Sequence, residues 1–478
     1  MSKDSDVGIY KQKKADYSER PPYFPPRIFE EYPFRDTRVD RKNETYDSLR
    51  QVFRLLELDT GNFGEKRWNP LGGFIFPGQA VLLKPNFVKH FSERGGVKAL
   101  ITHGSLIRAV VDYVYIALKG KGRIIIADGP MDDGDFDKIA SFTGLYEIKE
   151  FYKDKADFEI EIYDLRQEAV IKEGDEISQR LKLKGDLCGY KAIDLGKDSE
   201  FKRGDLNFKS FMGSECSPDI MSMHHNEKKD EYLIAGSFLN ADVVINMPKI
   251  KTHRRAGVTL SLKNMIGITG DRNWLPHFSE IVCPKDGANI RQGVLNKASE
   301  RLKQGIGLIK PLRDKLREMV GVTESVKLTG NWYGNDIIWR TIVDLARISA
   351  YADKNGVMKK ERQRRVFVIA DGIIAGESDG PVNPTPKPCG VIAAGFNEFA
   401  VDMAVTRIMG FDPMKIPLFR GISANALERL CGFDIKDIRC VSNIAAWNKA
   451  LSCLRGKCLG FKPHYGWKNH IEAEDVKK

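Results

Sequence analysis

Residues 241–277 read ADVVINMPKIKTHRRAGVTLSLKNMIGITGDRNWLPH. The apolar run at 241–250 predicts a buried strand, because the strands of parallel sheets are covered on both faces. The run continues directly into Lys249, Lys251 and His253. A strand that leads straight into charged residues places them at the carboxyl edge of a sheet, where α/β proteins bind ligands. We therefore predict a ligand site that begins at Lys249.

Further strands and helices on both sides of this stretch predict the same architecture. Buried strands are expected at 80–87, 122–130, 158–165, 365–374 and 389–396, and helices at 45–57, at 105–119 and from Glu398 to Met409. This alternation predicts an α/β fold with a parallel sheet covered by helices. Residues 1–45 carry prolines and aromatic side chains and are expected to be irregular.

Two acidic turns, in IIIADGP and FVIADGI, follow strands in similar surroundings and indicate two similar lobes. A chain of 478 residues is too long for one compact core. The predicted organisation is an N-terminal extension packing on the body at 1–75, a first α/β lobe at 76–284 with a polar insertion at about 170–230, a helical basic segment at 285–364, a second α/β lobe at 365–420 and a C-terminal basic extension at 421–478.

Composition narrows the class of partner. The formal net charge of +11 favours an anionic partner, although charge is first a matter of solubility. We do not expect nucleic acid, because no basic–aromatic recognition motif accompanies the charge. The polar N-terminus has no apolar signal segment, and no run approaches the ~20 apolar residues of a membrane span, so we expect a cytoplasmic protein. None of the eight cysteines forms a C-x-x-C pair, so an iron–sulfur cluster is not expected. Oligomerisation stays open.

The stretch after the strand is rich in cations, with hardly an acid to balance them. Lys249, Lys251 and Arg254 are predicted to hold a phosphate or carboxylate group. Lys84, at the end of the neighbouring strand, is predicted to join them. A solvated basic loop is the alternative, but VTLSLKNMIGI is too apolar for a free loop.

Lys263 and His253 are the predicted catalytic pair. A lysine buried among other cations has a lowered pKa, which favours covalent chemistry with carbonyl compounds. Imidazole titrates near neutrality, so His253 is predicted to act as general acid or base. The two functional groups are expected to face one pocket between the lobes, within about 10 Å of each other. The hydroxyl of Ser261 is expected to add a neutral hydrogen bond.

Acidic residues follow two other strands. Asp128 ends the strand in IIIADGP, and Asp371 ends another, shortly before Glu377 and Asp379. Closely spaced carboxylates suit Mg²⁺ or Ca²⁺, so Asp128 and Asp379 are candidate metal ligands, with turn formation by Asp-Gly as the equal alternative. Asp371 is predicted to form a negative wall of the cleft opposite the cations.

Histidines outside the main stretch each leave two interpretations. His103 precedes a helix for which Ser105 is the expected N-cap, and it could instead face a ligand at the helix N-terminus. His224 and His225 suggest a metal site, but neighbouring residues of a strand point to opposite faces.

At these residues the sequence resembles the family of domain of unknown function 362. The matching stretches run in order from about 80 to 420 and are VLLKPNFV, THGSLIRAVVDY, IIIADGP, ADVVINMPKIKTH, GVTLSLKNMIGI, ADGIIAGESDGP and GVIAAGFNEFAVDMAVTRIMGFDP. Some members carry an appended ferredoxin, but this chain lacks the cysteines for one.

The chain is also distantly similar to the lactate racemase family, whose members have two α/β lobes with a nickel-pincer nucleotide in the cleft. That resemblance implies two Rossmann-like lobes with mostly parallel sheets and a ligand cleft between them. It places His253 and Lys263 as the family's catalytic His and cofactor-bearing Lys, with His277 and His103 as further site histidines. The racemase loop is richer in Gly and lacks the Leu-Lys-Asn-Met run found here. We therefore carry over the fold and the pocket location, and we do not expect the nickel cofactor itself.

Together these features predict a cytosolic enzyme that acts on a small phosphate- or carboxylate-bearing substrate or cofactor in a cleft lined by Lys, Arg and His. Isomerase or transferase chemistry is favoured, and a non-catalytic cofactor- or metabolite-binding protein is the alternative. A divalent metal stays open. The predicted site residues are Lys263, His253 and Asp371 for catalysis, Lys84, Asn86, His103, Lys249, Lys251, Arg254, Ser261, Asn264 and His277 for binding, and Asp128 and Asp379 for a metal.

Overall fold

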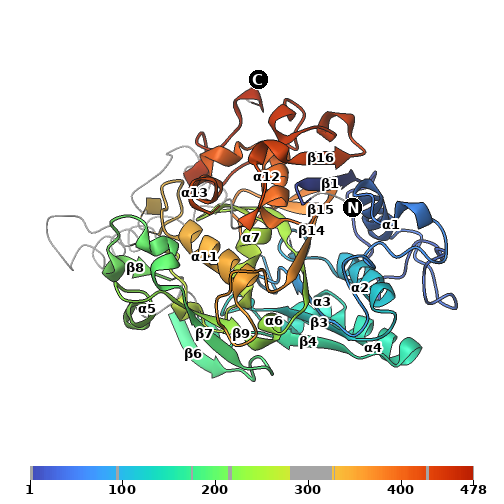
Figure 1. Cartoon of the computed structure of the whole chain (residues 1–478), viewed down its shortest axis with the longest axis horizontal. Helices are drawn as coiled ribbons and strands as arrows, with labels where there is room; N and C mark the ends of the chain where they lie inside the picture. The colour runs from blue at the N-terminus through green and yellow to red at the C-terminus, as the bar shows by residue number, and fades with distance from the viewer. Residues whose placement is uncertain are drawn as a thin grey trace.

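The computed structural model of the chain describes residues 4–92, 96–173, 176–213, 218–279, 326–327, 329–426 and 430–476. The helices of these residues are α1 Glu44–Leu55, α2 Gly104–Leu118, α3 Phe136–Phe142, α4 Leu145–Ala156, α5 Pro218–His224, α6 Gly236–Leu239, α7 Ser261–Asn264, α11 Ile338–Tyr351, α12 Glu398–Met409 and α13 Pro417–Asn425 (Figure 1). The strands are β1 Asp6–Lys11, β2 Ala80–Pro85, β3 Arg123–Asp128, β4 Ile160–Asp164, β5 Glu168–Glu173, β6 Glu176–Lys182, β7 Tyr190–Asp194, β8 Phe211–Met212, β9 Glu231–Ala235, β10 Val243–Met247, β11 Lys249–His253, β12 Gly257–Thr259, β13 Phe278–Ser279, β14 Arg365–Glu377, β15 Thr385–Gly395 and β16 Arg439–Ser442.

Ten of these strands form one mixed, mostly parallel sheet, which confirms the predicted α/β class. The main order is β16-β1-β15-β14-β10-β2-β3-β4, and β11 and β12 extend it beside β14. The five strands from β14 to β4 run parallel to one another. Their carboxyl ends therefore meet at one edge, as the sequence predicts.

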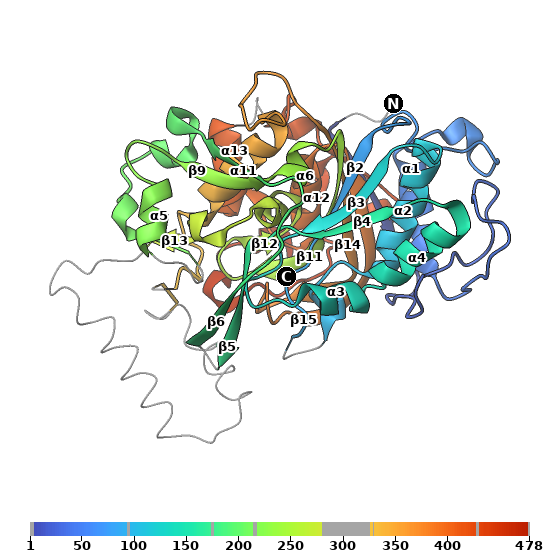
Figure 2. The same ribbon diagram turned by 90° about the horizontal axis from the view of Figure 1, so that it is seen from below.

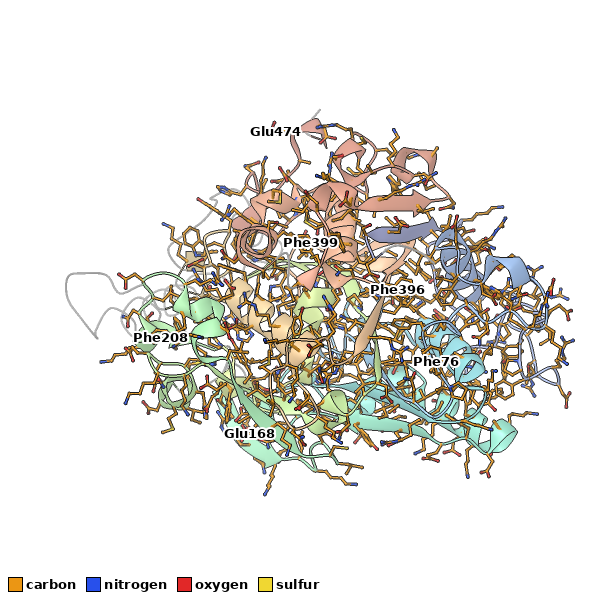
Figure 3. The ribbon with its side chains drawn as sticks, viewed as in Figure 1. Phe76, Glu168, Phe208, Phe396, Phe399 and Glu474 are labelled. Carbon is orange, nitrogen blue, oxygen red and sulfur yellow. The ribbon has the colours of Figure 1, made fainter. Side chains whose placement is uncertain are left out.

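The apolar run of β10 is continuous because the sheet is buried on both faces. Val244 packs into one hydrophobic cluster together with α11 and α12. Phe399 of α12 belongs to this cluster and lies near the middle of the view in Figure 3. Val243 and Ile245 pack into a second cluster, together with α1 and α2. Alternate side chains of the strand are buried on each face of the sheet. This removal of apolar surface from water is the main contribution that favours folding.

The strands of both predicted lobes lie in this one sheet. β10, from the predicted first lobe, pairs with β14, from the predicted second lobe, so that Val244 lies opposite Val366. The lobes therefore do not have separate sheets, because the apolar strands pair with each other directly. The predicted domain boundaries stay predictions.

The prediction that residues 1–45 are irregular is wrong for β1. This strand pairs antiparallel with β15 and parallel with β16, and Figure 1 shows the three strands side by side. Its Val7 and Ile9 are fully buried. The alternating apolar residues of DVGIYK carry that signal, but only pairing with distant strands makes six residues a stable strand.

The prediction that β14 ends at Asp371 is also wrong. The strand continues to Glu377 and pairs with β11 on one side and β15 on the other. Asp371 therefore lies inside the sheet rather than at its edge.

Residues of the predicted insertion form small antiparallel sheets, in which β5 pairs with β6 and β7 with β9. Most of the predicted helical basic segment lies outside the described residues, while α11 within it is a buried helix. Among the described residues, no helix has both the length and the apolar character needed to span a membrane.

Candidate active site

The β11–β12 hairpin and α7 position the candidate site. Thr252 pairs with Val258 across the hairpin, and Gly257 takes the turn with a φ of 79°. A Cβ at Gly380 would lie 1.9 Å from the carbonyl oxygen of Thr252. Only glycine allows the loop between β14 and β15 to lie this close to β11.

Asp402 of α12 holds the start of α7. Its carboxylate accepts hydrogen bonds from the backbone N–H groups of Ser261 at 2.8 Å and Leu262 at 2.9 Å, and from the Ser261 hydroxyl at 2.5 Å. Burial raises the pKa of Asp402 to about 7, although these hydrogen bonds act against the shift. The hydroxyl of Ser261, predicted to bind ligand, is used for this cap. Asp402 thus fixes the turn that carries Lys263.

A small cavity of about 80 Å³ lies between this turn and the carboxyl ends of β2 and β3. We call it the cationic cavity. Its polar lining consists of Asn86, Asp128, His253, Arg254, Arg255, Thr259, Lys263, Asn264, Arg272 and His277. The structure therefore brings Lys263 and His253 to one cavity, together with the predicted residues Asn86, Arg254, Asn264 and His277.

Lys263 is the central charge of the cationic cavity. Its Nζ has no hydrogen-bond or ion-pair partner among the residues that the structure describes. Burial, together with the positive charges of Arg272, Arg255 and Lys84, lowers the pKa of Lys263 from 10.5 to about 7. A substantial fraction of this amine is therefore uncharged at neutral pH, and the uncharged form is the nucleophilic one.

His253 presents an N–H group to the cavity. Its Nδ1 accepts hydrogen bonds from the backbone N–H groups of Arg255 and Ala256, both at 3.0 Å. Burial and the nearby charge of Lys263 hold the pKa of His253 well below its usual value, so the ring is neutral. A neutral ring with an unprotonated Nδ1 carries its proton on Nε2. In this state His253 is a hydrogen-bond donor toward a ligand.

His277 has the opposite tautomer. Its Nδ1 lies 2.7 Å from the carbonyl oxygen of Leu275 and can only donate to it. Burial and the charges of Arg255 and Lys263 hold the pKa of His277 well below its usual value. Its Nε2 is therefore unprotonated, and among the described residues it has no hydrogen-bond partner. His277 thus offers a base where His253 offers a donor.

Two further polar atoms at the cavity lack partners. The Thr259 hydroxyl and the Asn86 Oδ1 are buried without a hydrogen bond among the described residues. The amide group of Asn86 is oriented by Asn264, which accepts from its Nδ2 at 3.0 Å. Buried polar groups without partners are costly, which favours a bound ligand or water here.

Backbone carbonyls position two arginines at the cavity. Arg272 donates to the carbonyl oxygens of Gly129 at 2.7 Å and Pro130 at 2.8 Å, and its Nε lies 3.4 Å from Asp132. Arg255 donates to a backbone carbonyl at 3.1 Å. Neither arginine was among the predicted site residues, although both lie in the quoted stretch 241–277.

The predicted anion site of Lys84, Lys249, Lys251 and Arg254 is not assembled. Three of these residues bind groups inside the protein, and only Arg254 lines the cavity. Lys84 pairs with Asp128 at 2.5 Å, and Lys251 donates to the Leu100 carbonyl at 2.6 Å. All three lysine side chains are fully buried, so each needs a partner within the fold.

Asp371 binds Lys249 and does not line the cavity. Its carboxylate lies 3.1 Å from Lys249 Nζ, accepts from the Tyr17 hydroxyl at 2.5 Å and accepts from the His103 backbone N–H at 3.0 Å. These three bonds join distant parts of the chain, and a fourth comes from the nearby Ile373 N–H at 3.3 Å. The predicted catalytic role and negative wall therefore have no support in this geometry.

The remaining predicted histidines and acids have structural partners. His103, not Ser105, is the N-cap of α2, and its ring stacks on Tyr17 at 4.0 Å. Asp128 is neutralised by Lys84, while Asp379 lies 3.7 Å from His464.

His224 ends helix α5 rather than lying in a strand, and it lies 2.9 Å from Glu231. His225 lies 3.0 Å from Asp230. Within the described ranges, no group of three His, Cys, Asp or Glu side chains is placed to hold a metal ion.

These features define an α/β protein with a cationic cavity at the carboxyl edge of a mostly parallel sheet. The chain belongs to the family described as Domain of unknown function (DUF362), whose model matches residues 81–187 and 192–407.

Two comparisons with individual proteins add distant likenesses. The chain is 24% identical over 213 residues to the "Thylakoid-associated protein sll1697" of Synechocystis sp. (strain ATCC 27184 / PCC 6803 / Kazusa). That match covers 45% of this chain and 44% of the cyanobacterial protein. A solved structure from Thermotoga maritima, a structural genomics target, shares 9% identity with a TM-score of 0.28 over 70% of this chain and 53% of that one. A score this low carries no argument, and the similarity to lactate racemases stays a prediction.

Proposed function

We propose that the protein is an enzyme that binds a small phosphate- or carboxylate-bearing molecule in the cationic cavity. The observation that carries this proposal is the Nζ of Lys263, which lies near Arg254, Arg255 and Arg272 and has no partner among the described residues. Asp128, the one carboxylate among the described residues that line the cavity, is already neutralised by Lys84. Among the residues that the structure describes, no further carboxylate lines the cavity, and a bound anion would balance the charge of Lys263.

The groups at the cavity also support a reaction. The uncharged amine of Lys263 can add to a carbonyl carbon, while the Nε2–H of His253 donates to the carbonyl oxygen and the Nε2 of His277 accepts a proton. Loss of water then gives an imine, whose neighbouring C–H becomes more acidic. Moving that proton leads to isomerisation, and attack of a second group on the imine carbon leads to transfer.

Inorganic phosphate or sulfate is expected to raise the melting temperature of the wild-type protein. Binding to the native state alone stabilises it, so a concentration of 100 times the dissociation constant should give a rise of about 3 °C or more. Lys263→Met should abolish the rise, while Lys354→Met, a change at an exposed lysine, should keep it. Thermal unfolding with and without added phosphate, in a buffer that itself contains no oxyanion, measures the rise for both variants. An equal rise in the Lys263→Met protein would place the anion elsewhere.

Pyruvate with cyanoborohydride is expected to label Lys263. The amine should form an imine with this keto acid, and reduction should fix it as a stable adduct that peptide mass spectrometry locates. Because the pKa of Lys263 is about 7, labelling should fall steeply as the pH drops below 7, when the amine becomes protonated. Anion binding without labelling would favour the non-catalytic alternative, a metabolite- or cofactor-binding protein.

A further inference from the structure

The cationic cavity is too small for most metabolites. Its volume of about 80 Å³ is far below the ~300–1,000 Å³ of ordinary ligand sites. Such a space suits one phosphate or carboxylate group with little attached to it. The rest of a larger ligand needs room next to the cavity.

A second, much larger space lies beside it. We call it the flanking groove, a depression of about 1260 Å³ between α3, β4 and the β5–β6 hairpin. Figure 2 shows this hairpin projecting from the body, and Figure 3 labels Glu168 at its start.

Three separate chain segments line both the cavity and the groove. In each, one residue faces the cavity and the next one or two face the groove. The segments are Val88 followed by Lys89, Met131 followed by Asp133, and Pro381 followed by Val382. Since Met131 N–H also donates to the Val88 carbonyl at 2.9 Å, two of these segments are bonded at the boundary. The cavity and the groove therefore adjoin.

The two spaces differ in charge. The basic side chains of the cavity outnumber its carboxylates, whereas those of the groove are nearly balanced. Several groove carboxylates pair within the protein: Arg166 pairs with Asp164 at 2.6 Å, and Lys89 pairs with Asp133. This balance leaves the groove without net attraction for a charged ligand.

The groove also exposes large apolar side chains. Phe91, Tyr146, Ile171 and Leu187 line it and are 46%, 41%, 44% and 56% exposed. Covering apolar side chains with another apolar group lowers the free energy, and a concave surface allows the most contact with that group. Among the described residues, the excess of positive charge thus lies in the cavity, while the exposed large apolar side chains lie in the groove.

We infer that the anion in the cationic cavity is the head group of a larger small molecule whose neutral, largely apolar body lies in the flanking groove. This inference rests on the proposed function and adds the substrate class to it, an alkyl- or aryl-bearing phosphate or carboxylate. The head group is held by charge, and the body contributes affinity through apolar contact.

Calorimetric titration with inorganic phosphate and with hexyl phosphate tests the inference. Each buried methylene strengthens binding about fourfold, so hexyl phosphate should bind at least tenfold more tightly than phosphate. Ile171→Asp and Leu187→Asp should remove most of this gain and leave phosphate binding unchanged. Val357→Asp, at an exposed apolar residue outside the groove, is the matched control.

The outcomes separate the two proposals. If wild-type protein binds hexyl phosphate no more tightly than phosphate, the groove holds no ligand body, while anion binding in the cavity stands. If Lys263→Met leaves the affinity for both probes unchanged, the proposed function itself fails. If sedimentation shows a wild-type dimer that Ile171→Asp converts to a monomer, the groove is an interface between copies of the chain and the inference is overturned.

Discussion

Lys263→Met is expected to stabilise the ligand-free protein while it abolishes anion binding. Methionine fills a similar volume without a charge, and the native state no longer has to hold, among arginines, an ammonium group that has no partner in the described part of the chain. The pKa of Lys263 falls from 10.5 to about 7 in the fold, which corresponds to a cost of charging on the order of 5 kcal/mol. Few substitutions at ordinary sites stabilise a protein by this much.

The pH dependence of this gain has a definite sign. The folded pKa lies below the unfolded value, so between about pH 7 and 10.5 the unfolded state binds more protons. Stability of the wild-type protein therefore rises with pH across that window as far as Lys263 is concerned. The advantage of Lys263→Met should be greatest below pH 7 and should shrink toward pH 10.

Urea unfolding at pH 6 and pH 9 measures this difference. Other groups that titrate near neutrality, such as Glu398 and Asp402 with pKa values of about 7, are common to both proteins and cancel in the comparison. Lys354→Met should change stability little at either pH. A Lys263→Met protein that is less stable than wild type, or equally more stable at both pH values, would contradict the assignment of an unpaired charge.

Asp371→Asn is expected to destabilise the protein by about 3–5 kcal/mol, since breaking a buried ion pair leaves an uncompensated charge. Lys249 and Asp371 are both fully buried, and the Tyr17 hydroxyl donates to the same carboxylate. An asparagine keeps the size but cannot neutralise the ammonium group 3.1 Å away. The sequence alone placed Asp371 among the catalytic residues in the wall of the cleft, whereas the structure places it in a buried ion pair.

Denaturant unfolding of two further variants isolates the cause. Asp154→Asn, at an exposed residue of α4, should leave stability within about 0.5 kcal/mol of wild type. Asp371→Asn combined with Lys249→Met should recover part of the loss, because the unpaired charge is removed as well. A stable Asp371→Asn single variant would show that the ion pair matters little to the fold.

The sequence predicted the parts of the fold that depend on local pattern. The buried strand at 241–250, its counterparts at 80–87 and 122–130, and the helix at 105–119 are visible because burial on one or both faces imposes an apolar period on neighbouring residues. The strand at the N-terminus escaped prediction, since both its partners lie more than 350 residues away in the chain.

The sequence by itself determined where the charges gather: the strand-to-cation transition at Lys249 to Lys263 places them at the carboxyl edge of a parallel sheet. Only the tertiary structure decided which of them remain available to a ligand. Lys249 is neutralised by Asp371, and Lys251 donates a hydrogen bond to the Leu100 carbonyl, both from segments more than 100 residues away, whereas Lys263 meets no such partner among the described residues. Charge is a property of each residue, but its neutralisation depends on what the fold brings within about 3 Å.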